Sequence, residues 1–105
     1  MNLRMDLSKK DLHMFFRDWQ VKVLNYLWEN KEGFSVKELY ASLGEDTISR
    51  ASILYFLNEA VDNGLVEKEI TTGRGGIRGI YSSKYDLEST KQYLVKEFTE
   101  RLQEL

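Results

Sequence analysis

The chain of 105 residues contains no cysteine and no proline. Without cysteine it has no disulfide framework, catalytic thiolate, iron–sulfur cluster or cysteine zinc site, and it cannot sense copper or redox state through thiols. Its longest apolar run, Ile53 to Leu57, is far shorter than the ~20 residues of a membrane-spanning helix. The N-terminus lacks the apolar segment of a secretory signal. We therefore expect a cytoplasmic protein that does not bind membranes.

The chain also has no excess of positive charge. Its 15 basic and 17 acidic residues give a net charge of −2, which excludes a polybasic coat of the kind that histone-like proteins use. Residues 47–84 carry five basic and four acidic residues, whereas residues 1–46 and 85–105 are both net acidic. Any binding to nucleic acid should therefore depend on a few well-placed contacts within 47–84 and should weaken with salt.

Residues suited to catalysis are scarce. The single histidine, His13, lies among apolar neighbours, and no Asp, Glu and His residues recur at metal-ligand spacing. A serine elbow is also missing. The sequence predicts a protein that is not an enzyme and that needs neither metal nor cofactor, and it names no small-molecule effector.

Apolar periodicity predicts helices at residues 17–30, 35–43, 49–63 and 86–105. Ser35 and Glu38 form a capping box for the second helix, and Thr47 or Ser49 caps the third. Asp86 caps the last helix, and Gly33 suits the left-handed conformation that follows the first. Residues 1–16 leave two alternatives open, a helix that begins near Lys9 or a break before residue 17.

Residues 65–70 and 77–83 have the pattern of two strands around a glycine-rich tip, which predicts a β-hairpin. The fold class expected is mainly α with a small β-hairpin, because three helices followed by a hairpin is the order of a winged helix-turn-helix. We expect one DNA-binding domain over 1–105, made of an extension (1–16), the winged helix (17–84) and a C-terminal dimerisation helix (85–105).

In such a fold the N-terminal end of the third helix meets base edges in the major groove, and the wing contacts the backbone or the minor groove. Arginine reads guanine, serine bonds to several base edges, and glycines allow close approach of the backbone. The expected DNA contacts are Ser35, Thr47, Ser49, Arg50, Ser52, Tyr55, Lys68, Arg74 and Arg78. The wing proper is expected at Gly73–Gly79. The simpler interpretation is a solvated helix start and a hairpin that needs glycines only to turn.

The C-terminal helix has an apolar stripe that something must cover. Its members are Leu87, Leu94, Val95, Phe98, Leu102 and Leu105. The stripe could pack on the first helix of its own domain, or on the same helix of a second chain. We favour the homodimer, because the end of the helix lies far along the chain from the winged core and a symmetric pair matches a palindromic DNA site.

Several short motifs, in order, resemble the penicillinase-repressor (BlaI/MecI-type) winged-helix regulators, with a looser likeness to MarR- and PadR-type regulators. They are Leu27-Trp28, Ser35-Val36-Lys37-Glu38-Leu39, Ala51-Ser52-Ile53, Leu57-Asn58, Asn63-Gly64-Leu65-Val66, Gly73-Arg74 and Ile80-Tyr81-Ser82. The resemblance implies a homodimeric DNA-binding repressor whose C-terminal region dimerises.

Two departures limit what the resemblance implies. Tyr55, Glu59 and Asn63 stand where the family often carries threonine, arginine and lysine, so its operator preference is not transferred. The tail is a single predicted helix, so control by proteolysis of the tail is not expected. The sequence thus predicts a sequence-specific repressor of double-stranded DNA that binds as a homodimer. The alternative is a winged helix that binds another protein instead of DNA.

Overall fold

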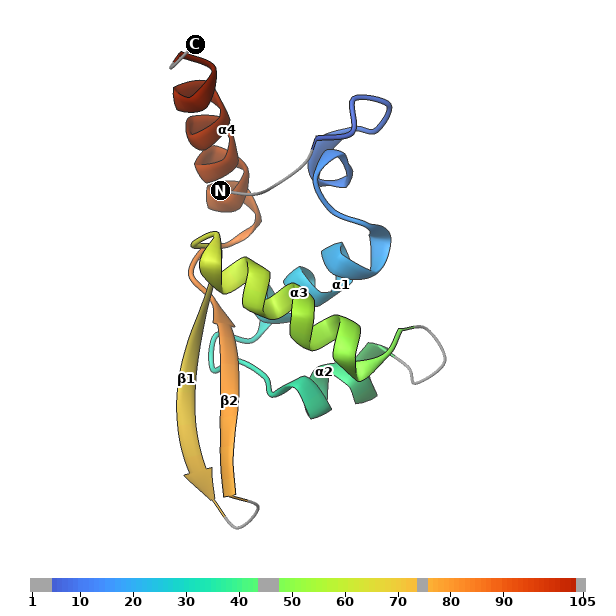
Figure 1. The fold of residues 1–105 in the computed structure, drawn as a ribbon, viewed down its shortest axis with the longest axis vertical. Helices are drawn as coiled ribbons and strands as arrows, with labels where there is room; N and C mark the ends of the chain where they lie inside the picture. Colours follow the sequence, from blue (N-terminus) through green and yellow to red (C-terminus); the bar gives the residue numbers. More distant parts are fainter. Residues whose placement is uncertain (1–4, 44–47, 74–75, 104–105) are drawn as a thin grey trace.

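The structure is a computed structural model that describes residues 5–43, 48–73 and 76–103. A short 3₁₀ turn η1 (Asp11–Met14) precedes three helices, a hairpin and a last helix (Figure 1). These are α1 (Asp18–Glu29), α2 (Val36–Leu43), α3 (Arg50–Asp62), β1 (Val66–Gly73), β2 (Gly76–Ser83) and α4 (Leu87–Gln103). This mostly helical winged helix confirms the fold class expected from the sequence.

The N-terminal segment breaks before α1 instead of continuing as one helix from Lys9. The backbone N–H of Arg17 donates to Oε1 of Gln20 at 2.8 Å, which satisfies a donor at the start of α1. Before this break, Leu12 and Phe16 already reach the core. The segment is therefore a separate packed element, and the second of the two alternatives is the correct one.

Side chains cap α2, α3 and α4 at the positions that the sequence indicated. The Glu38 N–H donates to the Ser35 hydroxyl at 3.2 Å, and the Ser35 N–H donates to Oε1 of Glu38 at 3.0 Å. Ser49 caps α3, since its hydroxyl accepts from the Ser52 N–H at 3.1 Å. The other candidate for this cap, Thr47, lies outside the described residues.

The hairpin is longer than expected. Its antiparallel register pairs Val66 with Ser83 at the base and Gly73 with Gly76 at the far end, so that only residues 74 and 75 lie between the strands. The predicted boundaries were wrong there because Thr71 and Thr72 are β-branched and continue the strand. Gly76 has a φ of +95°, which suits the end of a tight hairpin.

A third, one-residue strand was not predicted. Phe34 forms a bridge to Tyr81, with N–H to O distances of 2.9 and 2.8 Å. It lies on the free edge of β2, so β2 is hydrogen-bonded on both sides. This bridge attaches the base of the wing to the connection between α1 and α2.

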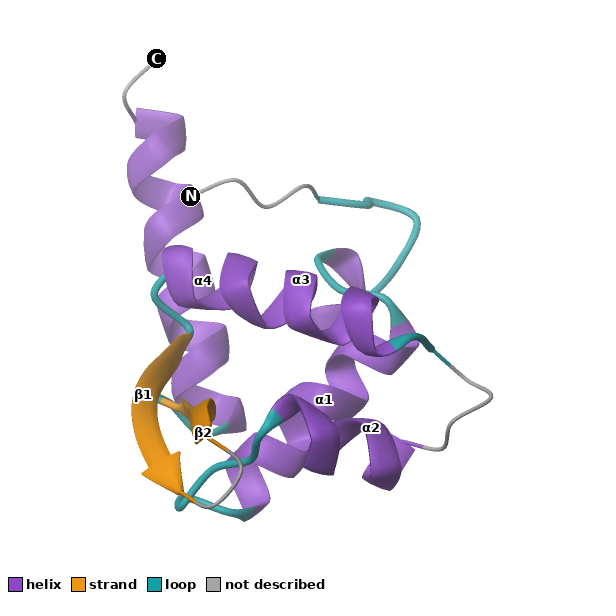
Figure 2. Ribbon diagram, turned by 60° about the horizontal axis from the view of Figure 1, so that its bottom comes forward, coloured by secondary structure: helices purple, strands orange, loops and turns teal. Residues whose placement is uncertain are grey.

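The core lies where α1, α2 and α3 meet the base of the hairpin (Figure 2). Its fully buried members include Val23, Leu24, Leu27, Leu39, Ile53, Leu57, Leu65 and Tyr81. The helix α4 extends away from this core (Figure 1), and the molecule measures 50 × 27 × 22 Å. In the described part of the chain, no helix has the length and apolar character to cross a membrane.

Capping makes part of the stability pH-dependent. Hydrogen bonds from the N–H and hydroxyl of Ser89 hold the pKa of Asp86 below its usual value of 3.8. The carboxylate therefore stabilises the folded state fully above about pH 5, and this contribution is lost as the pH falls through the lowered pKa. We expect the melting temperature of Asp86→Asn to fall less between pH 6 and pH 3 than that of the wild type, since asparagine caps a helix without titrating. Equal falls in thermal unfolding experiments would contradict this role for Asp86.

Candidate nucleic-acid interface

The start of α3 presents short hydroxyls whose positions are fixed by hydrogen bonds. Besides capping the helix, the Ser49 hydroxyl donates to the Ser52 hydroxyl at 2.9 Å. Ser49 is exposed and Ser52 is half-buried. The two hydroxyls therefore lie together at the first turn of α3, close to the N–H groups that an anion such as a phosphate would meet.

Arg50, the first residue of α3, is exposed, and its guanidinium lies 5.9 Å from the centre of the Tyr40 ring on α2. A cation over an aromatic face is attracted to it, which restricts the long side chain without neutralising its charge. Arg50 is thus held at the junction of α2 and α3 with its charge available to a partner.

The outward face of α3 differs in part from the expected one. Tyr55 is 72% exposed, as expected of a DNA contact, and Leu54 is 43% exposed although it lies within the apolar run Ile53 to Leu57. Asn58 was not predicted to contribute, yet its Oδ1 accepts a hydrogen bond of 3.0 Å from the Tyr81 hydroxyl. Asn58 thereby fixes the orientation of α3 relative to the wing. The position of Asn58 in a helix gave no signal of this contact, because the partner lies 23 residues away in sequence.

Lys68 and Tyr81 lie on the same face of the hairpin. Lys68 pairs with Tyr81 across the strands, and its ammonium lies 5.5 Å from the centre of the Tyr81 ring. A Cβ on Gly79 would come within 2.8 Å of Cε of Lys68, so the missing side chain at 79 makes room for the lysine stem. Because residues at alternate positions share a face, the exposed Ile70 and Ile77 lie on this face too.

Arg78 lies within β2, opposite Thr71, in agreement with the strand predicted at 77–83, although the wing proper was expected to extend to Gly79. Its side chain is exposed and its charge contributes to the lowered pKa of Glu38, which is caused mainly by the hydrogen bond from the Ser35 N–H. Arg78 therefore belongs to the opposite face of the hairpin from Lys68, on the side of the start of α2. Arg74 lies outside the described residues.

The prediction for Ser35 is corrected. Its side chain is 5% exposed and its hydroxyl is used in capping α2, so it is not available to a nucleic acid. The capping box that Ser35 forms with Glu38 explains why a serine stands at this position.

The C-terminal stripe divides into an inner and an outer part. Leu94 is 2% exposed, and Phe98 packs on Phe15 with ring centres 5.0 Å apart, so these two contact their own chain. The expected dimer contact at Leu94 is thereby corrected. Val95 and Leu102 are 66% and 69% exposed, and Leu87 is exposed as well. Leu105 lies outside the described residues.

Beside the inner part of the stripe, a tyrosine of α4 is hydrogen-bonded to the end of α3. The Tyr93 hydroxyl donates to the carbonyl oxygen of Asn63 at 2.7 Å, and burial together with the Glu97 charge raises the pKa of Tyr93. The base of α4 is thus attached to the end of α3 and to the N-terminal segment.

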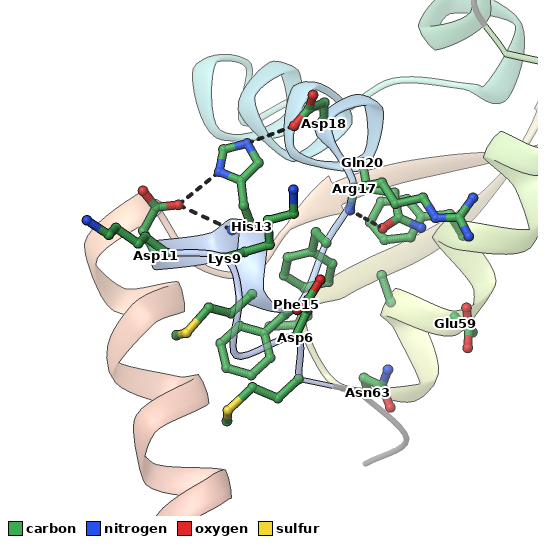
Figure 3. A pocket seen from close by; sticks show the side chains of 17 residues that line it. Asp6, Lys9, Asp11, His13, Phe15, Arg17, Asp18, Gln20, Glu59 and Asn63 are labelled. Carbon is green, nitrogen blue, oxygen red and sulfur yellow. Dashed lines mark hydrogen bonds and ion pairs between the residues drawn. The ribbon is translucent and has the colours of Figure 1, made fainter.

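The described side chains offer little for metal chemistry. Within residues 5–43, 48–73 and 76–103, no three His, Cys, Asp or Glu side chains gather closely enough to hold a metal ion. In that part of the chain, the two ring nitrogens of His13 lie 2.9 and 3.2 Å from carboxylate oxygens of Asp11 and Asp18 (Figure 3).

Comparisons with known proteins agree with this architecture. A solved structure from Methanosarcina mazei Go1, described as a possible transcriptional regulator, superposes with a TM-score of 0.64 over 85% of this chain and 75% of that chain, at 13% sequence identity. At this identity the likeness shows a shared fold. No curated protein sequence matches. The model of the penicillinase repressor family matches residues 17–104, which span α1 to α4. This chain therefore belongs to the penicillinase repressor family.

Proposed function

We propose that the protein is a homodimeric transcriptional repressor that binds double-stranded DNA sequence-specifically. Its family and its winged helix fold support a DNA-binding regulator. The observation that carries the proposal is the coupling of α3 to the wing through the Asn58–Tyr81 hydrogen bond of 3.0 Å. This bond keeps a helix and a hairpin at the fixed separation that simultaneous contact with two grooves requires.

In the proposed complex, α3 enters the major groove with its N-terminal half. Arg50, Tyr55 and the hydroxyls of Ser49 and Ser52 supply contacts of the kinds that read bases and bind phosphates. Lys68 and Arg78 approach the backbone from the wing, one on each face of the hairpin. Arg74 and Thr47 remain expected contacts.

The dimer is proposed from the outer part of the α4 stripe. Leu87, Val95 and Leu102 are large apolar side chains exposed along a helix that extends beyond the core (Figure 1). Pairing of two α4 helices would cover these side chains and double the few cationic contacts that each chain offers. A dimeric repressor of this kind would act in the cytoplasm, where its DNA target lies.

The experiment that tests the function is selection of bound fragments from a random DNA pool, followed by titration of the enriched sequence at two salt concentrations. We expect enrichment of a sequence with two half-sites and an affinity that falls as salt rises. No enrichment, or no binding at about 50 mM salt, would contradict the proposal.

Substitutions at two lysines distinguish a specific DNA contact of the wing from a general effect of positive charge on DNA binding. We expect Lys68→Ala to weaken binding to all sequences to a similar extent and to reduce the salt slope by about one for each protomer bound. The matched control is Lys22→Ala, which removes the same charge from the exposed surface of α1. Fluorescence anisotropy with labelled DNA measures the affinity and the salt slope of both variants. Equal effects of the two variants would mean that the wing makes no specific contact at Lys68.

A second candidate function is supported by the apolar side chains on the same surface. Leu54, Tyr55, Ile70 and Ile77 are all exposed, and residues 47–84 have almost no net charge. Exposed apolar groups in such a setting also suit a protein partner. The DNA selection decides between the two, because a protein-binding module would enrich no sequence.

A further inference from the structure

The two faces of the hairpin carry different charges. Residues that pair across β1 and β2 share a face, and so do alternate residues along each strand. Glu67 and Glu69 both lie on one face. On the opposite face, which we call the lysine face, Lys68 is the one charged residue among the described positions of the two strands. The members of the lysine face are Val66, Lys68, Ile70, Thr72, Ile77, Gly79, Tyr81 and Ser83. This face can therefore approach an anionic partner without repulsion from carboxylates.

The base of the lysine face is turned toward α3. Tyr81 is 1% exposed and Val66 is 3% exposed, and the Tyr81 hydroxyl donates to Oδ1 of Asn58 on α3 at 3.0 Å. The far half of the hairpin extends beyond the helices (Figure 1). A duplex that lies on α3 would therefore meet the lysine face of the wing and not the face that carries the glutamates.

The far half of the lysine face is apolar and exposed. Ile70 is 57% exposed and Ile77 is 75% exposed. Their partners across the strands are Gly79 and Thr72, so the two isoleucines are diagonal neighbours on different strands. No side chain stands opposite Ile70, because its partner is a glycine. The two isoleucines thus form one apolar projection near the end of the wing.

Apolar projections are used by proteins that bind the minor groove of DNA. Isoleucine, leucine or phenylalanine side chains enter between base pairs, partly unstack them and bend the duplex by roughly 20–90°. Ile77 lies four residues along β2 from Tyr81, the partner of Lys68, which is roughly 13 Å in a strand. Lys68 can therefore remain at the phosphates that border the groove while the isoleucines enter it. A protein partner would cover the isoleucines as well, yet the charge of the lysine face and its orientation toward α3 fit the phosphates of a duplex better.

We propose that Ile70 and Ile77 act as a wedge that enters the minor groove beside each half-site and bends the DNA. The wedge rests on the proposed function, since it needs a duplex on α3. The energetic cost of opening a base step depends on the sequence, and pyrimidine–purine steps such as TA and CA open most easily. The wedge therefore makes the wing select such steps without any hydrogen bond to a base.

The bend is measured by Förster resonance energy transfer between dyes at the two ends of the selected duplex, with the full-length protein bound. We expect the wild-type protein to bend the duplex by roughly 20° or more at each half-site. Ile70→Thr together with Ile77→Thr should reduce the bend by more than half and weaken binding about tenfold, because the apolar contacts with the opened step are lost. Threonine is β-branched and suits an exposed strand, so this variant is expected to fold. A straight duplex in the wild-type complex, or the same bend with both proteins, would overturn the wedge.

The matched control carries Met5→Thr and Leu7→Thr. These substitutions also remove two apolar side chains, 41% and 82% exposed, from the N-terminal segment, which lies away from the hairpin (Figure 1). The control should bind and bend the duplex as the wild type does, and far-UV circular dichroism checks that both variants are folded. If the control lost as much of the bend as the isoleucine variant, the bend would not come from the wing and the wedge would be refuted.

Selection from the random DNA pool tests the sequence preference. With the wild-type protein, we expect TA or CA steps at a fixed distance from the bases that α3 contacts in each half-site. The isoleucine variant should enrich the same half-sites without a preference at those steps. Equal preferences of the two proteins would overturn the wedge and leave the proposed function intact. A wild-type protein that enriches no sequence would instead refute the proposed function, and the wedge with it.

Discussion

Replacing Gly33 with alanine is expected to lower the free energy of unfolding by about 3 kcal/mol or more. Gly33 has a φ of +89°, a conformation that costs ~1–2 kcal/mol for an L-residue with a Cβ. The new Cβ would also lie 2.5 Å from the carbonyl oxygen of Tyr81 and 3.0 Å from Cγ2 of Ile80. The backbone oxygen cannot rotate away as a flexible side chain could, so the bridge between Phe34 and Tyr81 must open.

The consequence extends beyond one turn because the Tyr81 backbone pairs with Phe34, and its hydroxyl donates to Asn58 of α3. Displacing the Tyr81 strand therefore disturbs both the base of the wing and the orientation of α3. For a domain of this size, 3 kcal/mol corresponds to a melting temperature lower by about 12 °C or more, which differential scanning calorimetry measures.

Gly76→Ala is the matched control. Gly76 also has a positive φ, +95°, but a Cβ there would meet nothing within 4 Å. The Gly76→Ala substitution should therefore lower the free energy of unfolding only by the ~1–2 kcal/mol of backbone strain. The difference between the two variants isolates the close contact with Tyr81. If both variants lost the same stability, the contact at Gly33 would not be a constraint.

Introducing Val95→Glu together with Leu102→Glu is expected to convert a dimer into a monomer. Both side chains are well exposed on α4, so the folded chain tolerates the charges, whereas a paired apolar surface would have to bury four carboxylates. Light scattering should show the mass fall to that of one 12.4 kDa chain. A wild-type protein that is already monomeric would refute the proposed dimer.

Loss of the dimer should have a large effect on DNA binding. Two linked half-site contacts gain roughly 100-fold or more in affinity over either one alone. We therefore expect the double variant to lose about 100-fold in affinity for the selected two-half-site sequence. Point variants are preferable to deletion of α4, because Leu94 and Tyr93 stabilise the core of their own chain.

The matched control is Lys96→Glu. Lys96 is exposed on α4, about 100° and 120° around the helix from Val95 and Leu102, and this one substitution lowers the charge of each chain by the same two units. This variant should remain dimeric and bind DNA with nearly the wild-type affinity. If it lost as much affinity as the apolar double variant, the loss would reflect added negative charge and not a broken interface.

The sequence alone predicted the helices well because their signals are local. Caps such as Ser35 with Glu38, Ser49 and Asp86 act within one turn of the backbone, and apolar periodicity needs only neighbouring residues. Local reasoning would also bury Leu54, which stands in the apolar run Ile53 to Leu57, yet Leu54 is 43% exposed because the buried face of α3 is formed by Ile53, Phe56, Leu57 and Ala60. The apolar periodicity of a sequence does not determine how wide the buried face of the helix is.

What the sequence determined by itself is the order of the elements, their caps and the family motifs, all of which depend on residues a few positions apart. Only the tertiary structure decided which partner each side chain has. The Phe34–Tyr81 bridge, the Tyr81–Asn58 bond and the contact of Phe98 with Phe15 join residues separated by 47, 23 and 83 positions. Such pairs depend on how all elements pack at once, so no local pattern encodes them.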